Sequence, residues 1–155
     1  MNTADFEYAG FWIRVWASLI DSALLMLLVV PLMLMVYGTA YFDADSALIR
    51  GPADLLISWL LPALAVVLFW LLRRATPGKM AIAATVVDAG TGAALTPQQA
   101  LLRYLGYFVS TLPFGLGLIW VAFDPRKQGW HDKLAGSVVI RRRRRGPEPV
   151  SFDTR

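Results

Sequence analysis

The sequence predicts an all-α polytopic membrane protein with two transmembrane helices, a broken third hydrophobic segment and a small cytoplasmic β element. Composition is the first observation behind this prediction. Of the 155 residues, 57% are apolar and 17% are charged, whereas soluble domains are about 45–50% apolar and about 25% charged. A small soluble domain buries only about two-thirds of the surface that its unfolded chain exposes. This composition therefore excludes a plain soluble globule, and it equally excludes a disordered chain.

Two long uncharged stretches predict transmembrane helices. Residues 22–42 carry no charge, and the apolar run extends back through residues 15–20 with only Asp21 interrupting it. Residues 55–72 form a second uncharged run. A helix needs roughly 20 apolar residues to cross a hydrocarbon core about 30 Å thick. Lipid offers the backbone no hydrogen-bond partners, so both stretches are expected to be helical.

The third uncharged stretch, residues 104–123, contains helix-breaking residues in its middle. Pro113, Gly115 and Gly117 follow one another closely. Proline removes a helix hydrogen bond and glycine lowers helix propensity. The segment is therefore either one kinked span or a re-entrant hairpin of two half-helices.

Charge between these stretches predicts their orientation. Residues 37–54 carry Arg50 and three aspartates, whereas residues 73–103 and 124–145 are mainly basic. The positive-inside bias places both basic segments in the cytoplasm. We therefore expect a multi-pass protein of the cell (inner) membrane with cytoplasmic N- and C-termini. A single crossing by residues 104–123 would export the later arginine run, which favours the hairpin.

Two short stretches rich in β-branched residues predict the β element. Residues 81–88 are followed by a glycine turn, and Thr96 and Pro97 then have the pattern of a helix N-cap and first helical position. Residues 136–140 form a second such run. The two runs can pair only on one side of the membrane, and we expect the cytoplasmic side.

The C-terminal segment, residues 141–155, is predicted to be a basic, disordered tail behind a transmembrane domain of residues 8–140. Its start is five consecutive arginines: Arg141, Arg142, Arg143, Arg144 and Arg145. Basic residues beside a membrane bind anionic lipid headgroups at about 1 kcal/mol each. No aromatic residues are interleaved with the arginines, so we expect lipid binding and no nucleic-acid binding.

Three polar residues share one face of the first span. Arg14, Ser18 and Asp21 lie at helical spacing, and Asp21 is roughly 14 Å inside the helix start, near the bilayer midplane. A charge at that depth costs about 2.5–3.5 kcal/mol, so it needs a partner. In one interpretation Arg14 reaches the headgroups and Asp21 fixes helix packing. In the other, Asp21 and Ser18 bind an ion or a proton.

The order and spacing of several short motifs resemble the RDD family of membrane proteins. These motifs are residues 8–14, 19–22, 76–79, 86–88, 101–104 and 123–139. The resemblance implies that Arg14, Asp21 and Asp132 are the arginine and two aspartates that name the family, with Asp124 as a rival for the last position. It also implies a bacterial or archaeal cell membrane, and some members exchange monovalent cations such as sodium for protons.

The segment around Asp132 has two interpretations. Asp132 is either a cytoplasmic gate for a cation, or it caps a helix or pairs with Arg14 in an interfacial turn. For His131 we favour a place in that turn over titration near neutral pH. The chain has no cysteine and one histidine, so we expect no metal site and no cofactor.

The function expected from the sequence is cation and proton exchange through Asp21, with Arg14 as its tuning charge. Two or three helices enclose little space, so a transport pathway predicts a homo-oligomer. The alternative is a structural or accessory protein that assembles with a membrane partner. No nucleophile and base pattern stands out, so we do not expect an enzyme.

Overall fold

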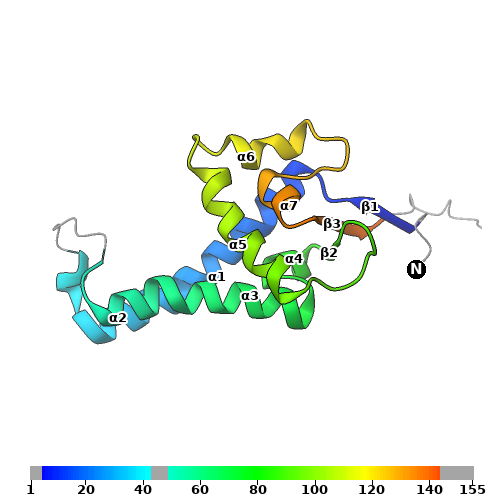
Figure 1. Ribbon diagram of the computed structural model, residues 1–155. Helices are drawn as coiled ribbons and strands as arrows, with labels where there is room; N and C mark the ends of the chain where they lie inside the picture. The colour runs from blue at the N-terminus through cyan, green and yellow to red at the C-terminus, as the bar shows by residue number, and fades with distance from the viewer. Residues whose placement is uncertain (1–4, 43–48, 144–155) are drawn as a thin grey trace, which may run out of the picture.

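The computed structural model describes residues 5–42 and 49–143. Figure 1 shows two long helices, α1 and α3, with the sheet at one end of the molecule and α2 at the other. The elements in chain order are β1 (Phe6–Tyr8), α1 (Phe11–Tyr37), η2 (Thr39–Phe42), α2 (Pro52–Asp54), η3 (Leu55–Leu60), α3 (Leu61–Arg73), α4 (Pro77–Ala81), β2 (Ala84–Asp88), α5 (Pro97–Thr111), α6 (Leu116–Ile119), η4 (Trp120–Ala122), α7 (Trp130–Leu134) and β3 (Ser137–Arg142).

In the part of the chain that the structure describes, two helices are long and apolar enough to cross a membrane, as predicted. They are α1, with 27 residues, and the continuous helix Pro52–Arg73, with 22 residues. Few of their apolar side chains are buried, and in α1 Leu27 is 74% exposed and Met35 is 82% exposed. Lipid rather than protein is the favourable surrounding for such a surface.

The first helix is shorter at its far end than the uncharged run predicted. It ends at Tyr37 and not at Phe42. Gly38 takes a positive φ of 65°, which glycine adopts without steric cost, and its N–H closes the helix on the carbonyl of Leu34. The uncharged residues after Gly38 form the short helix η2 instead.

Asp54 connects the far ends of the two long helices. Its carboxylate is buried and accepts hydrogen bonds from the hydroxyls of Tyr41, at 3.1 Å, and Ser58, at 2.7 Å. Its backbone N–H donates to the hydroxyl of Tyr37 at 3.2 Å. Asp54, one of the three aspartates counted in residues 37–54, therefore has a structural role. The other two, Asp43 and Asp45, lie outside the described residues.

The two predicted strands pair, and a third strand joins them. The sheet is antiparallel with the order β1-β3-β2, and Val86 lies opposite Val139 in the β2–β3 pair. The strand β1 was not predicted, because three residues are too few to show an alternating pattern. It places Glu7 opposite Arg141, and the two side chains form an ion pair at 2.5 Å.

The proposed start of a disordered tail at residue 141 is wrong. Arg141 and Arg142 belong to β3, and the backbone N–H of Arg143 donates to the carbonyl of Asp5. The physical reason is the unpredicted strand β1, which supplies backbone partners and the carboxylate of Glu7. Residues 144–155 lie outside the described residues, and lipid binding by the arginine run stays a prediction.

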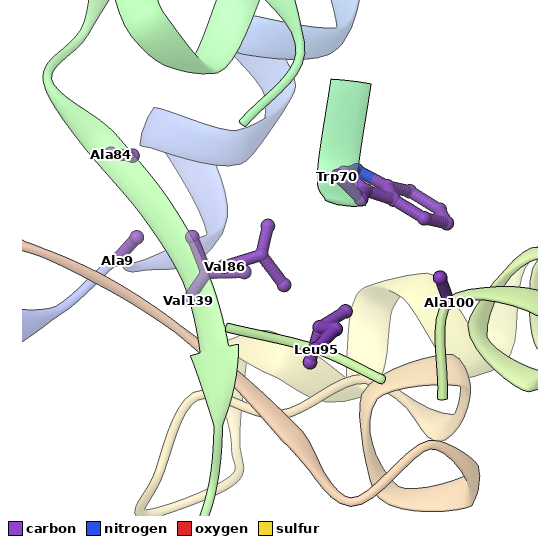
Figure 2. Packing of buried hydrophobic residues seen from close by; sticks show 7 residues of the cluster. All are labelled: Ala9, Trp70, Ala84, Val86, Leu95, Ala100 and Val139. Carbon is purple, nitrogen blue, oxygen red and sulfur yellow. The ribbon is translucent and has the colours of Figure 1, made fainter. Parts of the chain in front are cut away.

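A small apolar core joins the sheet to the helices. Figure 2 shows Val86 and Val139 on neighbouring strands. Leu95, just before α5, Ala100, in α5, and Trp70, near the end of α3, pack with them. All five are buried. The core therefore fixes the ends of α3 and α5 against the sheet, which positions the segments that meet α1.

The third hydrophobic segment is broken where the sequence predicted. Its first helix, α5, begins at Pro97 and is capped by Thr96, whose side chain forms a capping box with Gln99. After Thr111 the chain turns, and α6 with η4 runs at 112° to α5. Gly115 takes a left-handed conformation at this turn, with a φ of 73°. The segment is thus a bent pair of helices rather than one straight helix.

Candidate functional site

Asp21 lies against the short helix α4, which follows the second long helix. Its carboxylate accepts the hydroxyl of Thr76 at 2.5 Å and the backbone N–H of Gly78 at 2.7 Å. The contact requires glycine, because a Cβ at residue 78 would lie 2.0 Å from the carbonyl oxygen of Ala17. Asp21 therefore has the partners that an intramembrane acid needs.

These contacts refine the prediction in two details. Asp21 is level with the segment that follows the second span, and not with the middle of that span, because its partners are Thr76 and Gly78. The cation on the same hydrogen-bond chain is Lys79, whose Nζ donates to the Thr76 hydroxyl at 3.4 Å. Lys79, rather than Arg14, is therefore the cation linked to Asp21, and a tuning role for Arg14 stays a prediction.

Asp21 lines a cavity of about 450 Å³. Ser18 and Ser22 of α1 and Thr111 of α5 contribute hydroxyls to its wall, and Lys79 contributes an ammonium. A second cavity of about 370 Å³ shares Ser18, Ser22 and Lys79 but extends towards Arg14 and α6. Ser18, predicted as a partner of Asp21, thus borders both cavities. Sequence reasoning missed Lys79, which stands beside Gly78 in one of the family motifs.

Arg14 is committed to three other groups. Its Nε donates to the carbonyl of Ala9 at 3.0 Å, Nη1 to Asp132 at 2.5 Å, and Nη2 to the carbonyl of Lys127 at 2.5 Å. The ion pair between Arg14 and Asp132 is the one that the sequence suggested. It fixes the start of α1 to the loop and helix near the C-terminus.

Asp132 pairs with a second arginine that sequence reasoning did not assign. The Nη1 of Arg103 lies 2.5 Å from its Oδ1 and donates to the hydroxyl of Ser137 at 2.5 Å. Both side chains have no exposed surface. The available signal was a lone arginine inside an apolar helix, since a charge there requires a buried partner.

The surroundings of Asp132 keep it ionised. Burial alone would raise the pKa of this carboxyl, but Arg103 and Arg14 outweigh burial and hold the pKa well below its usual range. Asp132 also accepts the backbone N–H of Gly129 at 3.0 Å, at the start of α7. The observed geometry is thus a buried structural centre, and the role of Asp132 as a gate stays a prediction.

His131 is buried in the same region. Its ring stacks on Tyr107 with centroids 4.0 Å apart, and its Nδ1 lies 3.3 Å from the hydroxyl of Ser110. Burial lowers the pKa of His131 from 6.5 to about 3, and the neighbouring arginines add to this effect. His131 is therefore neutral near pH 7, which agrees with the structural interpretation that the sequence favoured.

This lowered pKa predicts a loss of stability in mild acid. Below pH 6.5 the unfolded chain binds a proton on its one histidine, whereas the folded chain does not until about pH 3. We expect the free energy of unfolding in detergent to fall by about 1–2 kcal/mol between pH 6.5 and pH 5. A His131→Phe variant, which keeps the stacking on Tyr107, should lose this dependence. An unchanged pH profile in the variant would contradict the assignment.

The fold and the site define a helical membrane protein whose charged residues join α1 to the segments near the C-terminus. The family model of the RDD family matches residues 8–136. The chain belongs to the RDD family.

The chain is also similar to several uncharacterized proteins. The chain is 32% identical over 143 residues to the uncharacterized membrane protein YteJ of Bacillus subtilis, covering 86% of this chain and 80% of that protein. It is 31% identical over 139 residues to the uncharacterized protein YckC of the same organism, covering 86% and 85%. It is 36% identical over 73 residues to the uncharacterized protein RP437 of Rickettsia prowazekii, covering 47% of this chain and 40% of that protein. No solved structure matches.

Proposed function

We propose that this protein exchanges monovalent cations for protons across the cell membrane, with Asp21 as the binding group. The observation that supports this proposal is the position of Asp21 in a membrane-spanning helix, facing a cavity lined by Ser18, Ser22 and Thr111. Carboxylate and hydroxyl oxygens suit hard cations. A carboxylate can alternatively take a proton, so one group binds either of the two exchanged species.

Lys79 adds a feature that such an exchange can use. Its ammonium is linked to Asp21 through the hydroxyl of Thr76. A cation that binds Asp21 meets the positive charge of Lys79, so cation binding favours movement of the Lys79 side chain away from Asp21. In this proposal Lys79 makes the Asp21 site release its cation readily, which transport requires as much as binding.

The orientation belongs to the same proposal. We place both termini in the cytoplasm of a cell with an inner membrane, and we treat α5 and α6 as a re-entrant hairpin. The bend of 112° between them turns α6 back from the direction of α5, which supports the hairpin. Two spanning helices enclose little space, so the pathway would form between copies in a homo-oligomer.

Exchange can be measured with purified protein in liposomes under an imposed sodium or pH gradient. Asp21→Asn should reduce the flux at least tenfold, because asparagine still accepts the Gly78 N–H but carries no charge and takes no proton. The matched control is Glu7→Gln. This substitution removes an acid that lines neither the cavity of Asp21 nor the second cavity. Wild-type protein without flux, or full flux in Asp21→Asn, would contradict the proposal.

A structural or accessory role is the second candidate. The observation that favours it is that Arg14, Arg103 and Asp132 all form contacts between elements of the chain. Those residues then serve assembly, and the apolar faces of the spans contact a membrane partner. Absence of flux together with one partner that copurifies in constant proportion would support this role.

A further inference from the structure

The second cavity, of about 370 Å³, has the charge and lining of a binding site for an anionic amphiphile. None of the described residues that line it is acidic, whereas Lys79 and Arg14 both line it. The donors of Arg14 are already bound to Ala9, Asp132 and Lys127. Lys79 is different, because its ammonium is buried at 6% exposure and has one long hydrogen bond to Thr76 among the described residues.

The balance of buried charge points the same way. Among the described residues around the two cavities there are three cations and two carboxylates. The cations are Arg14, Lys79 and Arg103, and the carboxylates are Asp21 and Asp132. Asp132 is shared by Arg14 and Arg103, and Lys79 reaches Asp21 only through the Thr76 hydroxyl. The group therefore carries one surplus positive charge, and no carboxylate of the described residues pairs directly with Lys79. An unpaired charge in a low-dielectric surrounding is costly, so an anion at Lys79 would be stabilising.

The rest of the lining suits a molecule with an apolar chain. Val15 and Leu19 of α1 face Leu118 and Ile119 of α6 across the cavity. Leu19 is 54% exposed and Ile119 is 43% exposed, so the cavity borders on the surface that the spans present to lipid. Small-molecule sites are typically about 300–1,000 Å³, mostly apolar, with a few polar groups. This cavity fits that description.

We propose that this cavity binds an anionic phospholipid, with the phosphate at Lys79 and one acyl chain between α1 and α6. The hydroxyls of Ser18 and Ser22, which make no hydrogen bond within residues 5–42 and 49–143, are further donors to the phosphate oxygens. The lipid would fill the space between α1 and the bent helix pair and so hold α6 in place. The site does not depend on cation exchange by Asp21.

Binding can be measured as the rise in thermal midpoint of the detergent-solubilised protein on titration with short-chain phosphatidylglycerol. Short-chain phosphatidylcholine and inorganic phosphate are the parallel titrants. We expect phosphatidylglycerol alone to raise the midpoint, with an apparent Kd at least tenfold weaker in Lys79→Gln. Lys79→Arg should keep binding, and Arg73→Gln, which removes an exposed cation outside the cavity, should change the Kd less than twofold.

A second variant tests the acyl-chain part of the site without removing charge. Val15→Phe fills the cavity and should weaken phosphatidylglycerol binding, whereas Leu27→Phe, on the lipid-facing surface, should not. An equal response to phosphatidylglycerol and phosphatidylcholine would overturn the proposal. So would an equal response to inorganic phosphate, or unchanged binding in both Lys79→Gln and Val15→Phe. Because this readout does not involve flux, a protein without transport activity can still confirm the lipid site.

Discussion

Asp132→Asn is expected to destabilise the protein by about 3–5 kcal/mol. Asp132 is the shared partner of Arg14 and Arg103, and it has no exposed surface. Removing one member of a buried ion pair leaves the other charge uncompensated. The resulting destabilisation is much larger than the net stabilisation that the intact pair provides. Here two guanidinium groups lose their counter-charge together. The measurement is equilibrium unfolding in detergent, followed by tryptophan fluorescence.

The matched control for this substitution is Glu7→Gln. It removes an acid from another arginine, Arg141, in an ion pair whose side chains are partly exposed. Such pairs contribute about 0–1 kcal/mol, so this variant should unfold within about 1 kcal/mol of the wild type. Equal losses of unfolding free energy in the two variants would show that Asp132 does not stabilise the fold more than an exposed ion pair does.

Gly78→Ala is expected to destabilise the protein by about 2–4 kcal/mol. The new Cβ would lie 2.0 Å from the carbonyl oxygen of Ala17 and 2.9 Å from the carboxylate carbon of Asp21. Since neither the backbone of α1 nor the bound carboxylate can give way freely, α4 must move outward. Overpacking costs about 1–3 kcal/mol, and hydrogen bonds to charged groups contribute about 1.5–3 kcal/mol. The same unfolding measurement applies.

Gly10→Ala provides the control for the glycine substitution. A Cβ added at Gly10 would meet no atom within 4 Å, and the φ of −66° at this residue is one that alanine adopts readily. We expect a change within about 0.5 kcal/mol, as for most surface substitutions. Gly78 lies within α4, and alanine has a higher helix propensity than glycine. Without a close contact, Gly78→Ala would therefore stabilise the helix. A stabilised Gly78→Ala variant would therefore mean that α4 does not pack closely on α1.

Uncharged apolar runs and charge distribution predicted the large elements because both are properties of neighbouring residues in the chain. The two spans are visible as uncharged runs, and the break near Pro113 and Gly115 is visible as residues that oppose a helix. The helix start at Thr96 follows from capping chemistry within four residues. In each case the residues that decide the structure are neighbours in the chain.

The site was predictable only in part, for the same reason. The sequence indicated that Asp21 needs a partner and that Arg14 and Asp132 suit each other. It did not indicate that Thr76 and Gly78 would supply the partners of Asp21, which are 55 and 57 residues away. Contacts at such separations depend on how whole elements pack.

What the amino-acid sequence determined by itself is the membrane class, the two spans, the broken third segment and the need for a partner at Asp21. These follow from local composition and from the cost of placing charge in hydrocarbon. Only the tertiary structure decided which charged residues contact one another. Arg103 pairs with Asp132, and Lys79 is linked to Asp21 through Thr76. Long-range packing selects among several partners of suitable charge, because Coulomb's law favours any opposite pair and only the fold sets which distances are short.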